Sequence, residues 1–228
     1  MINYDNNFQT IIKNINIAKS ESIYHQEVKC VAVSKLVTHN EIRILNKLGQ
    51  KAFAESDAID FQKKVIELHD LNIEWHFIGP IQSNKIQYIA TNADWVQSIE
   101  KIKHIIRFNA LRSANLPKLN ILIEVKINNE KNKHGVINEE EIIKLADIIK
   151  TQDKLLLRGL MGIASNTSDE KILTNEFNHL KNIFDNINKL GYNMDTLSMG
   201  MSNDYKIAIA CGTTMIRIGR NFWKNQLN

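Results

Sequence analysis

From residue 28 almost to the C-terminus, short apolar runs rich in β-branched residues alternate with longer segments in which apolar residues recur at helical spacing. Strands that alternate with helices are typical of parallel sheets, because each helix carries the chain back to the start of the next strand. The pattern predicts strands at residues 28–34, 51–54, 73–78, 95–99, 119–127, 155–163, 196–198 and 214–218. A helix-like segment follows each of these strands.

Helix boundaries are clearest after the first strand. Thr38 and Glu41 have the spacing of a capping box, and Gly49 is a typical residue at which a helix stops. We therefore expect a helix at residues 41–48. Further helices are predicted at residues 139–150, 169–190 and 203–210, and an additional helix at residues 7–20 precedes the first strand.

This succession of strands and helices favours a closed (β/α)₈ TIM barrel over its main rival, an open doubly wound sheet. A length of 228 residues suits one such barrel, and no linker rich in Pro, Gly or Ser interrupts the pattern. Residues 1–228 are therefore expected to form a single domain. In these barrels the functional residues lie where strands end and loops begin, at the C-terminal face.

Charge and composition narrow the classes of partner. The 29 basic and 25 acidic residues are interspersed and leave a net charge of +4, which does not indicate a nucleic-acid-binding protein. No stretch is long and apolar enough to span a membrane, and the N-terminus lacks a signal-peptide core. The two cysteines, Cys30 and Cys211, have no metal-ligand spacing. We expect a cytoplasmic protein that binds a small anionic molecule and no metal.

Lys35 directly follows the most apolar strand, which places its amine at the mouth of the expected barrel. Desolvation and nearby cations favour the uncharged form of a lysine amine, the form that attacks an aldehyde to give a Schiff base. Position alone leaves open the alternative that Lys35 merely ends a strand at the surface.

Two loops carry residue types that bind anions. Residues 197–204 follow the seventh strand and lead into a helix, and they offer the hydroxyls of Ser198 and Ser202 together with backbone N–H groups. Gly219, after the eighth strand, permits close approach of the backbone to a ligand. Loops after strands seven and eight commonly bind phosphate in these barrels. The alternative is that Ser202 is an ordinary helix cap.

The densest cluster of unusual residues is WHFIGPIQSNK at positions 75–85, around the end of the third strand. His76 has no evident base or nucleophile beside it, and a single histidine at a strand end is more often structural than catalytic. The sequence contains neither metal-ligand spacing nor the glycine-rich loops of nucleotide-binding proteins. These absences exclude nucleotide-dependent chemistry.

Together these segments resemble the pyridoxal phosphate homeostasis proteins. That resemblance implies the barrel of the alanine racemase N-terminal domain, which is fold type III of the proteins that bind pyridoxal 5'-phosphate (PLP). The matching segments are AVSK at 32–35, WHFIGPIQSNK at 75–85, LSMGMSND at 197–204 and RIG at 217–219. Their order and spacing cover nearly the whole chain.

The resemblance implies a set of cofactor contacts. Lys35 is expected to form the Schiff base with PLP. The segment that contains Ser198, Met199 and Ser202 is expected to hold the phosphate, together with the backbone of Gly219. Ser56 and His76 resemble further cofactor-binding residues of the family.

Arg217 is expected, from the same resemblance, to face the pyridine nitrogen. An arginine donates a hydrogen bond without giving up its proton, so the nitrogen stays neutral and the ring becomes a weakened electron sink. Broad carbanion chemistry is therefore disfavoured.

The chain departs from the family pattern at three places. Ser56 stands where the family usually has Asn, and its side chain is shorter. Arg220 stands where the family has Thr or Ser, and a guanidinium there either pairs with the phosphate or turns outward. The segment 221–223 lacks the Gly that usually follows the aromatic residue. These changes bear on affinity for the cofactor more than on the Schiff base itself.

The function expected from these features is reversible PLP binding in vitamin B6 homeostasis, without enzymatic activity, by a monomer whose partners are PLP and PLP-dependent apo-enzymes. One alternative is a PLP-dependent amino-acid racemase, which needs a second acid/base group opposite Lys35. In alanine racemases that group comes from a separate C-terminal domain, whereas this sequence ends directly after the barrel. Another alternative is an aldolase that uses Lys35 on a sugar phosphate.

Overall fold

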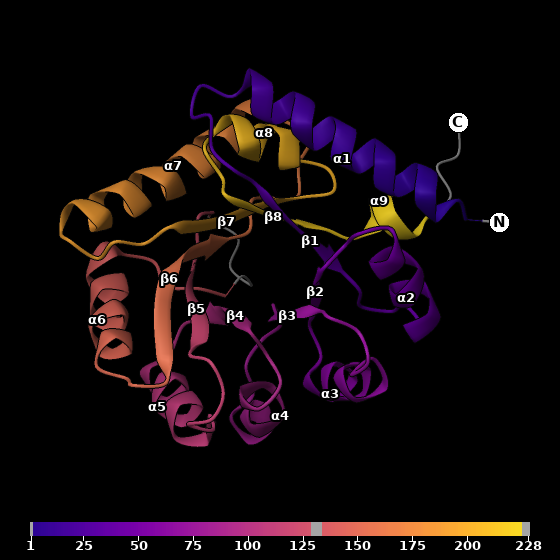
Figure 1. Ribbon diagram of the computed structural model, residues 1–228. Coiled ribbons are helices and arrows are strands. Elements are labelled where there is room, and N and C mark those ends of the chain that lie inside the picture. Colours follow the sequence, from indigo (N-terminus) through magenta and orange to yellow (C-terminus); the bar gives the residue numbers. More distant parts are fainter. Residues whose placement is uncertain (1, 129–133, 225–228) are drawn as a thin grey trace.

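A computed structural model describes residues 2–128 and 134–224, and its strands close into a barrel in the order β1-β2-β3-β4-β5-β6-β7-β8 (Figure 1). All neighbouring strands are parallel, including β8 and β1, which close the ring. The predicted TIM barrel is confirmed. The strands are β1 Lys29–Val33, β2 Ala52–Glu55, β3 Glu74–Phe77, β4 Trp95–Ile99, β5 Leu119–Val125, β6 Leu155–Gly162, β7 Thr196–Met201 and β8 Met215–Ile218.

Helices surround the barrel and connect successive strands (Figure 1). They are α1 Tyr4–Glu21, α2 His39–Lys47, α3 Ala58–Glu67, the 3₁₀ turn η1 Ser83–Lys85, α4 Ile86–Ala90, α5 Ile102–Leu111, α6 Glu139–Lys150, α7 Glu170–Lys189, α8 Tyr205–Ala210 and α9 Arg220–Trp223. The capping box of Thr38 and Glu41 is confirmed at the start of α2. The bounds predicted for α6 agree with the structure, where Asn138 caps the helix.

The seventh strand is longer than predicted. The strand was predicted to end at Ser198, and residues 199–201 were expected in the loop that leads into the next helix. In the structure β7 continues to Met201, and its register with β8 shifts between Ser198 and Met201. Gly200 has a φ of +95° there, which a residue with a side chain rarely adopts. The irregularity therefore lies within the segment assigned to phosphate binding.

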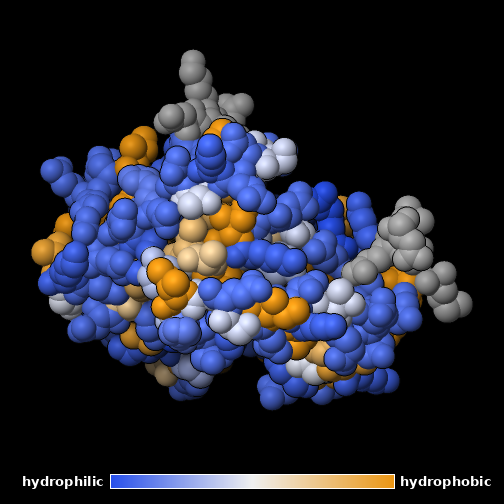
Figure 2. Space-filling view, turned by 90° about the horizontal axis from the view of Figure 1, so that it is seen from above, coloured by the Kyte–Doolittle hydropathy of each residue, from blue (hydrophilic) through white to orange (hydrophobic). Residues whose placement is uncertain are grey.

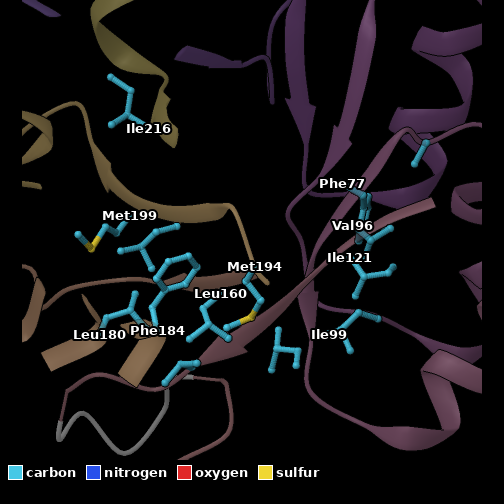
Figure 3. Close-up of a cluster of buried hydrophobic side chains, with 14 of the residues drawn as sticks. Phe77, Val96, Ile99, Ile121, Leu160, Leu180, Phe184, Met194, Met199 and Ile216 are labelled. Carbon is cyan, nitrogen blue, oxygen red and sulfur yellow. The ribbon is translucent and has the colours of Figure 1, made fainter. Parts of the chain in front are cut away.

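Successive side chains of each strand point to opposite faces of the sheet, so the buried side chains form two sets. One set lies inside the barrel and includes Val31, Val33 and Met161. The larger set lies between strands and helices, where Phe184 and Leu180 of α7 pack near Met199 of β7 (Figure 3). The outer surface seen from above is mainly hydrophilic, with smaller hydrophobic areas (Figure 2). This is the layering expected of a filled barrel.

The additional helix α1 packs against α8 and α9 (Figure 1). The Asn7 side chain is buried in this contact, and its Nδ2 donates to the carbonyl oxygens of Phe222 and Lys224, each at 3.0 Å. The first helix thereby fixes the short helix that begins with Arg220. No helix in the described ranges is both long and apolar enough to cross a membrane.

Candidate functional site

A cavity of about 420 Å³ opens at the C-terminal ends of the strands. Its lining combines basic, hydroxyl and apolar groups contributed by loops far apart in the sequence. The lining residues are Val33, Lys35, Ser56, Ile78, Met161, Ile163, Ala164, Ser165, Asn166, Thr167, Met201, Ser202, Asn203, Asp204, Arg217, Gly219 and Arg220. Six of the predicted site residues therefore share one cavity, namely Lys35, Ser56, Ser202, Arg217, Gly219 and Arg220.

Lys35 lies just beyond β1 with an exposed side chain, and its backbone is held from several directions. Trp223 Nε1 donates to the Val33 carbonyl at 2.7 Å, and Lys64 Nζ donates to the Ser34 carbonyl at 2.7 Å. Leu36, which follows Lys35, has a φ of +66°. Two tertiary hydrogen bonds and a left-handed residue thus fix the backbone from which the Lys35 side chain extends.

A buried ion pair stabilises this strand end. Lys64 Nζ lies 2.6 Å from Glu55 Oε1, and the Ser34 hydroxyl donates to the same oxygen at 2.6 Å. The Glu55 and Lys64 side chains are only 1% and 8% exposed, so both charges depend on each other and on Ser34 for hydrogen bonds. The pair couples β2 and α3 to the residue immediately before Lys35.

Ser202, Gly219 and Arg220 form the part of the cavity wall that follows β7 and β8. The Gly219 N–H donates to Ser202 Oγ at 3.2 Å, and Asn221 Nδ2 donates to the Ser202 carbonyl at 3.2 Å. Arg220 is exposed at the first position of α9. This wall offers a hydroxyl, backbone groups and a guanidinium, which together suit a phosphate.

Arg217 forms the floor of the cavity, with 3% of its surface exposed. Its two terminal nitrogens donate to Ser198 Oγ at 2.6 Å and to the Gly162 carbonyl at 3.0 Å. Burial lowers the pKa of Arg217 to about 10, partly opposed by the carboxylates of Asp204 and Glu124. The guanidinium therefore stays protonated at neutral pH and can only donate hydrogen bonds.

Ser56 lies on the cavity wall beside Gly79, and the two backbones meet closely. A Cβ added to Gly79 would lie 1.8 Å from the Ser56 carbonyl oxygen, so only glycine fits at position 79. Ser98 Oγ donates to the Gly79 carbonyl at 2.6 Å and fixes this approach. The segment around Gly79 therefore determines where Ser56 lies.

Three predicted site residues do not reach the described wall of the cavity, namely His76, Ser198 and Met199. His76 and Ser198 are fully buried inside the barrel, below the cavity. Met199 points the other way, into the core beside α7 (Figure 3), and its N–H donates to Thr213 Oγ1 at 3.2 Å. Ser198 and Met199 both belong to β7 and make internal contacts there, and their contact with the phosphate stays a prediction.

The loop after β6 is a part of the cavity that sequence reasoning missed. Ser165, Asn166 and Thr167 line it, and both the N–H and the hydroxyl of Ser165 donate to the Glu176 carboxylate, at 2.7 and 2.5 Å. The sequence did contain a signal for this loop. It is a run of small polar residues between the strand that ends in Gly162 and the cap of the next helix.

A family model described as the alanine racemase N-terminal domain matches residues 7–223. A pyridoxal phosphate homeostasis protein of Haemophilus influenzae is 38% identical over 223 residues, which cover 96% of this chain and 94% of that relative. The chain belongs to the pyridoxal phosphate homeostasis protein family. The resemblance drawn from its sequence motifs is confirmed at the level of the family.

Several solved structures have the same barrel fold. PipY of Synechococcus elongatus, solved without PLP, is 26% identical with a TM-score of 0.79, and the match covers 93% of this chain and 99% of PipY. PipY with PLP bound is 24% identical with a TM-score of 0.78, over 86% and 92% of the two chains. An alanine racemase of Clostridium difficile, 15% identical, shares the fold with a TM-score of 0.70 over 98% of this chain and 57% of the racemase.

Removal of the buried amine at position 64 tests the support beneath Lys35. Lys64→Met leaves the Glu55 carboxylate buried without its counter-charge, so we expect a loss of about 3–5 kcal/mol in the free energy of unfolding, measured with urea. Lys63→Met is the matched control, because that side chain is 68% exposed and lies 4.0 Å from Asp60. Its cost should stay within about 0.5 kcal/mol. Equal losses in the two variants would contradict this role of the ion pair.

Glu124 of β5 makes the stability depend on pH. Burial, with the nearby Glu100 carboxylate, raises the pKa of Glu124 from 4.5 to about 7. The folded chain therefore binds a proton more tightly there than the unfolded chain, and this contribution is complete below pH 4.5 and lost as the pH rises through 7. Glu124→Gln should raise the free energy of unfolding at pH 8 by up to about 3 kcal/mol relative to its effect at pH 4.5. Urea titrations of both proteins at pH 4.5 and pH 8 measure the difference, and an equal effect of Glu124→Gln at the two pH values would contradict it.

Proposed function

We propose that this protein is a cytoplasmic, monomeric PLP-binding protein that holds the cofactor reversibly and takes part in PLP homeostasis, with PLP-dependent apo-enzymes as its partners. The observation that carries the proposal is the convergence of Lys35, Arg217 and the Ser202–Gly219–Arg220 wall on one cavity. Membership of the pyridoxal phosphate homeostasis protein family supports it. Another member of this fold, PipY, has been solved with PLP bound.

The chemistry of the lining residues fits PLP group by group. The Lys35 amine suits an aldehyde, since its attack on the carbonyl carbon gives a Schiff base and releases one water. The hydroxyl, N–H and guanidinium groups of Ser202, Gly219 and Arg220 suit a phosphate dianion. Apolar side chains such as Ile78 and Met161 suit the faces of a ring.

Arg217 determines whether the ring nitrogen of a bound cofactor is protonated. When bound, PLP supplies an aldehyde and an electron-accepting ring. Arg217 remains protonated at neutral pH because even its lowered pKa is about 10, so it would donate a hydrogen bond to the ring nitrogen without protonating it. The electron demand of the ring is therefore weak, which favours holding the cofactor over using it for carbanion chemistry.

The racemase alternative requires an acid/base group on the face opposite Lys35. The described cavity wall contains no His, Tyr, Cys or Glu, and its one acidic residue is Asp204. Asp204 is buried, and its Oδ1 accepts the Met201 N–H at 2.5 Å, so this carboxylate caps the turn before α8. This lining favours binding over racemisation. Turnover of L-alanine to D-alanine that Lys35→Ala abolishes would reverse the choice.

The covalent role of Lys35 is tested by absorption and trapping. The protein incubated with PLP should show the absorption band of a Schiff base, and borohydride should fix a pyridoxyl group on Lys35, located by peptide mass spectrometry. Lys35→Ala should abolish the band and the adduct. Lys118→Ala, an exposed lysine at the opposite face before β5, should retain both. A wild-type protein that shows no band would overturn the proposal, and an adduct with a sugar phosphate would support the aldolase.

The role of Arg220 is tested by comparing PLP with pyridoxal, which lacks the phosphate. Arg220→Ala removes a charged hydrogen-bond donor, so we expect its affinity for PLP to fall about tenfold and its affinity for pyridoxal to stay unchanged. Arg220→Ser, the residue type usual in the family, should recover part of the loss. Arg107→Ala, an exposed arginine on α5, serves as the control. Equal losses for PLP and pyridoxal would show that Arg220 does not bind the phosphate.

A further inference from the structure

A continuous chain of polar side chains runs through the interior of the barrel beneath Arg217. Arg217 donates to Ser198 Oγ at 2.6 Å, and Ser198 Oγ donates to Gln97 Oε1 at 2.7 Å. Gln97 Nε2 lies 2.9 Å from His76 Nδ1, and His76 Nε2 lies 2.6 Å from Glu74 Oε1. The side chains of Ser198, Gln97 and His76 are at least 99% buried, so solvent does not supply alternative partners.

Donor and acceptor chemistry fixes the direction of the first links. The guanidinium of Arg217 only donates, so Ser198 Oγ accepts from it and must place its own proton elsewhere. The Ser198 proton therefore points to Gln97 Oε1. The opposite end of this amide, Nε2, also lies 3.3 Å from Met215 Sδ, which only accepts. The sulfur independently supports the same orientation of the Gln97 amide.

This orientation determines the protonation state of His76. Gln97 Nε2 donates, so His76 Nδ1 must accept and carries no proton. The ring proton is then on Nε2 and is donated to Glu74. Burial lowers the pKa of His76, against the opposing effect of Glu74, which agrees with a neutral ring.

Among the described residues, the groups around His76 have partners of their own. The ring stacks on Trp95, with centroids 5.4 Å apart and planes 8° apart. The charged groups that act on the pKa of His76 are Glu74, Lys29 of β1 and Asp94 before β4. Lys29 pairs with Glu74 at 2.8 Å, and Asp94 Oδ2 accepts the Trp75 N–H at 2.8 Å.

The chain also connects the two faces of the barrel. Arg217 lines the cavity at the C-terminal face, whereas Glu74 begins β3 and is 33% exposed beside Lys29. A protonated His76 would turn an Nδ1–H toward the Gln97 amide hydrogens. Reversal of the amide would then deprive Ser198 of its acceptor and turn an oxygen toward the Met215 sulfur. Each hydrogen bond of the chain is therefore compatible with only one donor and acceptor assignment of the hydrogen bonds beside it.

We propose that His76, Gln97 and Ser198 are positioning residues for Arg217, and that they form a directed hydrogen-bond relay in which His76 is the neutral Nε2–H tautomer. The relay holds the guanidinium that faces the cavity and ends at Glu74 on the opposite face. Its connection to the ring nitrogen of PLP rests on the proposed function, whereas the tautomer and the direction of the relay do not.

The tautomer is tested in the protein without added cofactor. ¹⁵N NMR of histidine-labelled protein should show His76 with its proton on Nε2 and an unprotonated Nδ1 throughout pH 6–8. In Gln97→Glu the new acceptor should draw a proton to Nδ1, and the ring should become an imidazolium. A wild-type His76 that is protonated on Nδ1, or charged at pH 7, would overturn the proposal. His104→Gln assigns the resonances of a second buried histidine as a control.

The positioning role is tested by the spectrum and affinity of bound PLP. Gln97→Met and Ser198→Ala should each shift the Schiff-base absorption maximum and weaken PLP binding about tenfold, because Arg217 loses a charged hydrogen bond or its support. Ser198→Thr retains the hydroxyl and should restore the wild-type spectrum. Unchanged spectra and affinities in folded Gln97→Met and Ser198→Ala would overturn the positioning role. If the wild type does not bind PLP, the proposed function fails, while the NMR result still decides the relay.

Discussion

The pairing of β1 with β8 is the contact on which the cavity depends. Ala32 pairs with Ile218, and Val31 with Arg217, so the last strand lies against the first along its whole length. Closure brings the loop that starts with Lys35 next to the loop that starts with Gly219, although the two are separated by nearly the whole chain. Backbone pairing of the two strands thus fixes the spacing between the two loops that follow them.

The fold was predictable because each strand is a short apolar run, and each run is followed by a segment of helical period with recognisable caps. Thr38 with Glu41, and the three glutamates that begin α6, mark helix starts through local chemistry that tertiary structure does not override. The strand ends were therefore known to within a few residues. Lys35, Arg217 and Gly219 follow from such strand ends together with the family motif.

The remaining part of the site depends on which side of a strand each residue faces. Ser198 and Met199 are neighbours in β7, so one points into the barrel and the other toward α7. The segment reads as a loop because it contains Gly200, and its continuation as a strand depends on pairing with β8. His76 was placed with the cofactor residues by its motif, but its depth inside the barrel depends on packing against Trp95. Contacts between distant segments decide both points, and a single sequence does not contain them.

The hydrogen bonds from Asn7 to the end of α9 give the additional N-terminal helix a structural role at the cavity, although the helix lies outside the barrel. The Asn7 amide donates to two carbonyl oxygens of the segment that carries Arg220 and Trp223. Trp223 in turn holds the strand that leads to Lys35. The first and last helices of the described chain are therefore bonded to each other beside the cavity. The pairing of β1 with β8 closes the sheet without this contact, and the contact instead stabilises the loops that carry Lys35 and Arg220.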